Sequence, residues 1–170
     1  MKSLLTICLA GLAAAAFAAE TAVDLSRKGS FLKWAPKTYY RTEPTVTVEN
    51  GVAKIVCGEL VEGAKPSRYQ FHVRSTRTFK AGVKYTFSFT LRSNMAVAKK
   101  DLFVGFMLGR KPYTKYAYFQ TALPANEKKT ITLSCTPEAD ITGPTCAPTV
   151  QLVLQKDQTV EIGDVKIVEE

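Results

Sequence analysis

The sequence predicts an all-β protein, an antiparallel β-sandwich of about eight or nine short strands. Three observations favour this fold class. Apolar and polar residues alternate with a period of two in many short segments. Glycine, proline and asparagine separate these segments at fairly regular spacing. Almost no stretch has the 3.6-residue periodicity of an amphipathic helix.

The clearest alternation lies within residues 69–92. Its apolar face, which we expect in the core, comprises Tyr69, Phe71, Val73, Tyr85, Phe87, Phe89 and Leu91. Gln70, His72 and Arg74 leave the opposite face of the first strand, and Gly82 supplies the turn before the second. If the two strands pair, the neighbouring polar row is Thr86, Ser88, Thr90 and Arg92. This polar face is where we expect function.

The remaining strands follow from the same pattern. Asn50-Gly51 between residues 45–49 and 52–57 is typical of a β-hairpin. The other alternating segments are residues 102–108, 116–121, 129–135, 149–155, 160–162 and 165–167. Strand order within the sheets does not follow from the sequence.

Residues 1–19 have the features of a cleaved secretory signal peptide. Lys2 precedes an apolar run over residues 4–16, and Ala16-Phe17-Ala18 places small residues where signal peptidase cleaves. The run is too short for a permanent membrane anchor. We therefore expect residues 20–170 to form one exported domain, secreted or periplasmic. No linker or internal repeat divides that range.

The chain is basic, with a formal net charge of +8. Its lysines and arginines are scattered and form no run of five or six like charges, which argues against a nucleic-acid-binding tail. Two interpretations remain open: an ordinary solvated basic surface, and attraction to an acidic polymer such as a uronic acid or sulfated glycan.

Three cysteines follow the predicted signal peptide: Cys57, Cys135 and Cys146. An oxidising compartment favours pairing, and Cys135 and Cys146 bracket a loop that contains two prolines and a glycine. We predict a disulfide between them that closes this loop. Cys57 is then interpreted as a small buried hydrophobe.

The sequence offers little evidence for a catalytic site. His72 is the only histidine, so a site with two histidine ligands is excluded. The sequence contains no G-x-S-x-G, C-x-x-C or phosphate-binding glycine loop. Asp and Glu fall mostly in loops and turns, and no pair can be placed on an inward-facing strand position as a glycosidase requires. We predict that the protein is not an enzyme.

Two segments resemble carbohydrate-binding modules of the family 4/9 type. These are YQFHVRSTRTFKAGVKYTFSFTLRSN (residues 69–94) and TVEIGDVKIVEE (residues 159–170), with Phe31 and Trp34 as a looser match near the start. The resemblance implies a galactose-binding-like jelly roll without catalytic apparatus. Family members bind glycans in a cleft over the concave sheet or at loops along one edge.

The resemblance also bears on metal and cofactor content. Many members contain a structural calcium, but Leu32 and Gly163 occupy the usual acidic positions, and Asp164 is the remaining candidate ligand. We predict no calcium and no cofactor.

Aromatic faces and planar polar groups recognise sugars. The candidate ligand-binding residues are Tyr39, Tyr40, Gln70, His72, Arg74, Arg92, Tyr113, Tyr116 and Gln151. Trp34 is interpreted as buried behind the opening strand, and the alternative for the polar face is that it is simply hydrated. The favoured hypothesis is a monomeric, secreted glycan-binding module. The rivals are a structural or adhesion sandwich that binds a protein at the cell envelope and, third, a small hydrolase.

Overall fold

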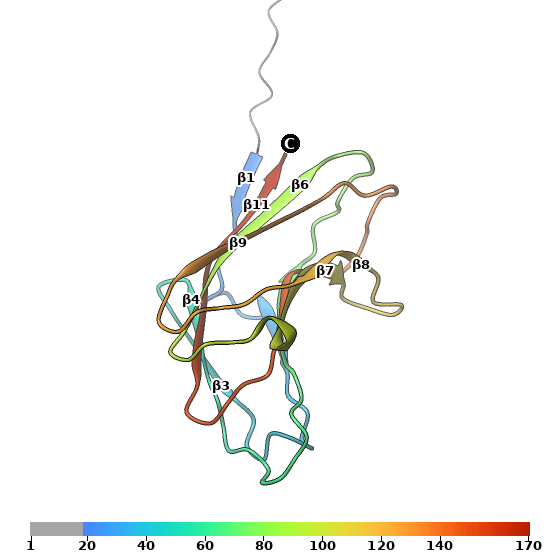
Figure 1. The fold of residues 1–170 in the computed structure, drawn as a ribbon. Coiled ribbons are helices and arrows are strands. Elements are labelled where there is room, and N and C mark those ends of the chain that lie inside the picture. Colours follow the sequence, from blue (N-terminus) through green and yellow to red (C-terminus); the bar gives the residue numbers. More distant parts are fainter. Residues whose placement is uncertain (1–18) are drawn as a thin grey trace, which may run out of the picture.

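The computed structural model describes residues 19–170, so the predicted signal peptide lies outside the described residues apart from Ala19. Two antiparallel sheets pack face to face (Figure 1). The predicted all-β sandwich is confirmed, with eleven strands among the described residues rather than eight or nine. Helix is confined to one short 3₁₀ turn, Lys99–Asp101, within the described range.

The strands divide into two groups, here named sheet A and sheet B. Sheet A contains β1 (Ala19–Ala22), β3 (Thr45–Glu49), β4 (Val52–Val56), β6 (Tyr85–Ser93), β9 (Lys129–Cys135) and β11 (Thr159–Glu169). Its order is β3-β4-β11-β6-β9, with β1 paired to β11. Sheet B contains β2 (Phe31–Trp34), β5 (Tyr69–Ser75), β7 (Leu102–Leu108), β8 (Lys115–Gln120) and β10 (Thr145–Leu152). Its order is β2-β5-β10-β7-β8.

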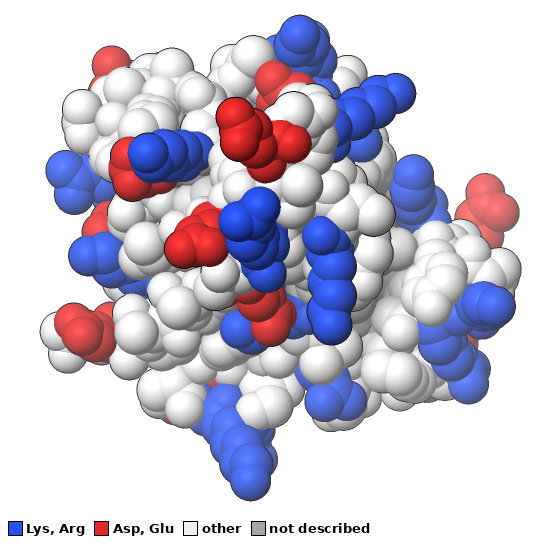
Figure 2. All heavy atoms as spheres, turned by 90° about the horizontal axis from the view of Figure 1, so that it is seen from below, with Lys and Arg blue, Asp and Glu red and all other residues white. Residues whose placement is uncertain are grey.

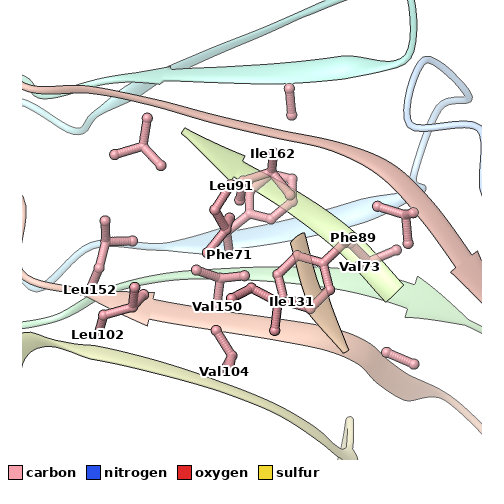
Figure 3. Packing of buried hydrophobic residues seen from close by; sticks show 14 of the residues in the cluster. Phe71, Val73, Phe89, Leu91, Leu102, Val104, Ile131, Val150, Leu152 and Ile162 are labelled. Carbon is pink, nitrogen blue, oxygen red and sulfur yellow. The ribbon is translucent and has the colours of Figure 1, made fainter. Parts of the chain in front are cut away.

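The inward-facing apolar residues of both sheets form one core (Figure 3). Phe71 and Val150 come from sheet B, whereas Phe89 and Ile131 come from sheet A, and all four are buried. The predicted apolar face of residues 69–92 is at most 1% exposed throughout. Alternation therefore identified the core side of these strands correctly, because successive side chains leave opposite faces of a sheet.

The two halves of residues 69–92 do not pair with each other. β5 pairs with β2 and β10 in sheet B, whereas β6 pairs with β9 and β11 in sheet A. The connection crosses between the sheets, and Gly82, with φ of +75°, donates its N–H to the carbonyl of Pro137. The alternation within each strand cannot distinguish such a crossover from a hairpin. In both cases the same apolar side chains of the two strands face the core.

The predicted disulfide between Cys135 and Cys146 is wrong in this structure, in which both cysteines are free. Cys135 ends β9 on the core side of sheet A, whereas Cys146 lies on the outer face of sheet B opposite Arg74. The two side chains therefore leave different layers in directions that do not meet. Cys57 is partly buried against the core, and burial raises the pKa of its thiol, and that of Cys135, to about 11.

Candidate functional site

Sheet B presents a polar and aromatic outer face. Directly opposed residues on paired strands point to the same side, so the strand register groups this face into rows. The Trp34 row contains Gln120, Phe103, Gln151, Gln70 and Trp34. The His72 row contains Tyr118, Gly105, Thr149, His72 and Leu32. The Arg74 row contains Lys115, Met107, Cys146 and Arg74.

Two hollows lie along this face and meet at Trp34 and Gln70, which line both. The first, of about 590 Å³, extends past His72 and Cys146 to Tyr113. The second, of about 330 Å³, is lined at its opposite end by Arg68, Asp101 and Gln151, among others. Because the two share one row, they form a single groove that runs along the strands, and we name it the sheet B groove.

His72 occupies the middle of the groove within a hydrogen-bonded chain. Its Nε2 lies 3.0 Å from Oε1 of Gln70, and its Nδ1 contacts the hydroxyl of Thr149, a fully buried residue. An Nε2–H that donates to Gln70 leaves Nδ1 to accept from Thr149, so the neutral imidazole satisfies both contacts. Burial lowers the pKa of His72, which favours this neutral form.

The lowered pKa of His72 predicts a pH-dependent stability. Above the ordinary histidine pKa of about 6.5, folding is unaffected by this group; below it, the unfolded chain binds the proton more readily than the folded protein. We expect the free energy of unfolding to fall as the pH drops from about 6.5 to 5, and His72→Gln to flatten that decline. Urea denaturation at several pH values measures this, and an equally steep decline in the variant contradicts it.

Tyr118 covers the middle of β7 because residue 105 is glycine. A β-carbon at Gly105 would lie 2.5 Å from a ring carbon of Tyr118, so a larger residue would displace the ring. The phenol hydroxyl of Tyr118 donates to Oε1 of Gln151 at 2.8 Å, and its ring stacks on Phe103 at 5.4 Å between centroids. These contacts fix an aromatic and amide surface beside the groove.

Carboxylates are scarce on this face. None of the five strands of sheet B contains Asp or Glu. Within residues 19–170, Asp101 is the one acidic residue among those that line the two hollows. The lining of this groove therefore does not contain the two carboxylic acids that a glycosidase uses to cleave a glycosidic bond.

Five of the nine predicted ligand-binding residues lie on or beside the sheet B groove. Gln70, His72 and Tyr113 line the first hollow, Gln151 lines the second, and Arg74 stands in the neighbouring row. Tyr113 follows β7 in a loop and is 51% exposed. The other four lie elsewhere in the structure.

Tyr39 and Tyr40 were predicted to be ligand contacts, and the structure corrects this, because they are only 8% and 2% exposed. The segment is a turn rather than extended chain, since both backbone N–H groups donate to the carbonyl of Pro36. Tyr39 donates its hydroxyl to the carbonyl of Leu154, and Tyr40 to that of Ser67. Because each hydroxyl has a hydrogen-bond acceptor, both tyrosine rings can be buried in the core without leaving a polar group unpaired.

Arg92 and Tyr116 also lie away from the groove. Arg92 stands on the outer face of sheet A, 3.7 Å from Glu161, because β6 belongs to the other sheet. Tyr116 points inward from β8 and packs on Phe106, with 5.1 Å between ring centroids. Neither side chain lines the sheet B groove.

Sequence reasoning missed three apolar groups of this face: Leu32, Trp34 and Phe103. Trp34 was expected in the core but is 52% exposed, and Leu32 is 48% exposed. Phe31-Leu32-Lys33-Trp34 contains three apolar residues in four and so gives no alternation signal. Their directions follow from the structure, because Phe31 stacks on Phe71 in the core and the period of two of a strand then turns Leu32 and Trp34 outward.

The residues at the expected calcium position do not fit that metal. Leu32 faces the groove and Gly163 has no side chain. The carboxylate of Asp164 accepts from Lys128 at 2.7 Å and from Thr90 at 3.1 Å. No group of three His, Cys, Asp or Glu side chains suited to a metal occurs within residues 19–170.

Comparison with known proteins gives a structural likeness only: no protein-family profile and no curated protein matches the chain. A family 4 carbohydrate-binding module aligns with a TM-score of 0.58 at 19% identity, over 82% of this chain and 86% of that one. The N-terminal cellulose-binding domain of Cellulomonas fimi β-1,4-glucanase C aligns with a TM-score of 0.54 at 15% identity, over 83% and 89%. The chain has the fold of a carbohydrate-binding module.

The resemblance inferred from residues 69–94 and 159–170 is therefore confirmed at the level of the fold. An arabinose-bound GH51 α-L-arabinofuranosidase also aligns, with a TM-score of 0.55 at 13% identity, over 88% of this chain but 24% of that enzyme. This module-like fold thus also matches one part of a larger protein.

No helix in residues 19–170 is both long and apolar enough to span a bilayer.

Proposed function

We propose that this protein is an exported, non-catalytic module that binds a poly- or oligosaccharide in the sheet B groove. The observation that carries the proposal is a groove bordered by exposed aromatic rings and amide side chains, with almost no carboxylates. Trp34 and Tyr113 supply the rings, each about half exposed. Gln70 and Gln151 supply the amides.

The groove chemistry matches the two surfaces of a sugar. Ring faces cover the apolar C–H patches of a pyranose, whereas planar amides exchange hydrogen bonds with its hydroxyls. Because Trp34 and Gln70 line both hollows, one ligand chain can pass from the first hollow to the second. The shared fold supports the assignment, since the family 4 module and the cellulose-binding domain have the same sandwich.

Several further properties belong to the proposal. The protein acts as a monomer outside the cytoplasm, after removal of residues 1–19. It needs no calcium, because Lys128 and Thr90 already engage the carboxylate of Asp164. It does not cleave its ligand, because the groove lacks a pair of acids. The ligand is a glycan, and acidic glycans are included among the candidates.

Affinity electrophoresis against a panel of soluble polysaccharides tests this proposal. The panel contains β-glucans, xylan, mannan, galactan, polygalacturonate and alginate, with bovine serum albumin as the non-binding reference protein. We expect at least one polysaccharide to retard migration, and nuclear magnetic resonance titration with its oligosaccharide to shift the indole N–H signal of Trp34. Migration unchanged by every polysaccharide overturns the proposed function.

Release of reducing sugar tests the non-catalytic part separately. We expect no increase over the buffer when the protein is incubated with the retarding polysaccharide. Turnover that is lost on Asp101→Asn would instead assign a catalytic carboxylate and contradict the proposal.

A further inference from the structure

The two sheets differ in how their cations are paired. Basic and acidic side chains lie interspersed over the end of the molecule shown in Figure 2. On the outer face of sheet A, three cations have a carboxylate within 4 Å, and Lys54, opposite Glu161 in the strand register, is the exception without one in residues 19–170. The pairs are Arg92–Glu161 at 3.7 Å, Lys128–Asp164 at 2.7 Å and Lys166–Glu20 at 2.9 Å. An external anion on that face competes with a carboxylate of the protein itself.

Sheet B has the opposite arrangement. Arg68, Arg74 and Lys115 lie on or beside its outer face, and none has a carboxylate within salt-bridge distance in residues 19–170. Lys33 is the exception in this sheet, because its amine lies 3.5 Å from Glu43. The sequence explains the difference, since the sheet B strands contain no acidic residue that could supply a partner.

Two of the three unpaired cations rest on aromatic rings. The guanidinium of Arg68 lies 4.1 Å from the ring centroid of Phe103, and the amine of Lys115 lies 4.2 Å from that of Tyr118. A cation over a ring face is attracted by the ring quadrupole. Arg68 also donates to the carbonyl of Lys100 at 3.3 Å, and its other N–H groups can still meet an anion. Arg68 lines the second hollow, and Lys115 stands next to Met107, which lines the first.

The third unpaired cation, Arg74, stands at the far end of its row from Lys115. Three strand intervals separate these residues, from β8 through β7 and β10 to β5, which corresponds to ~14 Å across the sheet. Arg74 and Lys115 therefore stand on opposite sides of the groove, which crosses their row at Cys146 and Met107. Anionic groups on the two sides of one bound chain, or on neighbouring chains, can each contact one of these cations.

We propose that the ligand of the sheet B groove is an anionic polysaccharide, whose carboxylate or sulfate groups contact Arg74, Lys115 and Arg68. This inference rests on the proposed glycan-binding function and names its substrate class. Arginine offers a planar pair of donors to a carboxylate or sulfate, and charge-assisted hydrogen bonds are the stronger kind. Asp101 shares the second hollow with Arg68 and weakens the attraction there, so the contacts of Arg74 and Lys115 matter most.

The test compares two polymers with one backbone, polygalacturonate and its fully methyl-esterified, neutral form. We expect at least tenfold tighter binding of polygalacturonate at low ionic strength, and a loss of that advantage at 0.5 M NaCl because salt screens exposed charges. The comparison is repeated with hydroxyethylcellulose and carboxymethylcellulose, so that the result does not depend on one backbone.

Variants locate the contact. Arg74→Gln and Lys115→Gln are each expected to weaken binding of the anionic polymer at least threefold and to leave binding of the neutral polymer unchanged. The matched controls are Lys128→Gln and Lys166→Gln, which remove the same charge from sheet A. We expect these controls to bind both polymers like the unaltered protein.

The outcomes separate this inference from the proposed function. Equal or tighter binding of the neutral polymers overturns the anionic ligand and leaves glycan binding intact. An equal loss in the sheet A controls, or equally tight binding of single-stranded DNA, reduces the effect to general charge attraction and overturns the inference. Failure to bind any polysaccharide overturns both.

Discussion

Phe106→Ala is expected to lower the free energy of unfolding by about 3–5 kcal/mol, the usual cost of truncating a fully buried phenylalanine. Phe106 has no exposed surface and connects the two layers of the sandwich. It extends inward from β7 of sheet B, and its ring centroid lies 4.6 Å from that of Phe87 on β6 of sheet A. The ring of Phe79 lies 4.8 Å away and that of Tyr116 5.1 Å away.

This large loss follows from the rigidity of the site. Phe87 lies on β6, which is paired on both sides, and the rings of Phe79, Phe87 and Tyr116 already pack closely, so they can close a cavity only in part. Equilibrium denaturation in urea, followed by tryptophan fluorescence and circular dichroism, measures the effect. Phe119→Ala is the control, because Phe119 is 39% exposed on the edge strand β8. A loss below about 1 kcal/mol for Phe106→Ala would show that this ring is not packed between the sheets.

Trp34→Ala is expected to weaken binding of the ligand at least tenfold, which corresponds to ~1.4 kcal/mol. Trp34 offers the largest ring of the groove and lines both hollows, so a ligand that occupies either hollow meets it. Since the side chain is 52% exposed, its removal leaves the core untouched. Isothermal titration calorimetry with the polysaccharide found in the panel measures the change.

Two further variants distinguish the loss of ring stacking on the sugar from a loss of protein stability. Trp34→Tyr retains a ring and is expected to keep most of the affinity, whereas Phe119→Ala removes an exposed ring that does not line the groove and is expected to change nothing. The free energy of unfolding should change by no more than about 0.5 kcal/mol in Trp34→Ala, as is typical of surface substitutions. Unchanged affinity of Trp34→Ala for the polysaccharide would show that the ligand does not bind in the sheet B groove.

Alternation predicted the fold class and the core side of most strands, because most inward positions of a sandwich are apolar. It also placed Gln70, His72 and Arg74 together on an outer face, as the structure confirms. A period of two describes one strand at a time and contains no information on its partners. For this reason the sequence left open whether β6 pairs with β5, and Arg92, predicted to bind the ligand, lies on the other sheet.

The remaining errors have separate physical causes. β1 and β2 contain only four residues each, too few for alternation to be recognised. The burial of Tyr39 and Tyr40 depends on long-range partners, since their hydroxyls bond to the carbonyls of Leu154 and Ser67. The cysteine pairing was inferred from distance along the chain, whereas geometry in space decides whether a disulfide forms.

The pairing of β1 with β11 places the first described residue beside the C-terminal end of the chain, since Ala19 is the register partner of Glu169 (Figure 1). Both belong to sheet A, the layer that faces away from the groove. A biosensor could therefore be coated with this protein through a linker at residue 20 or residue 170. In either orientation the attached protein would present the sheet B groove to the sample rather than to the chip.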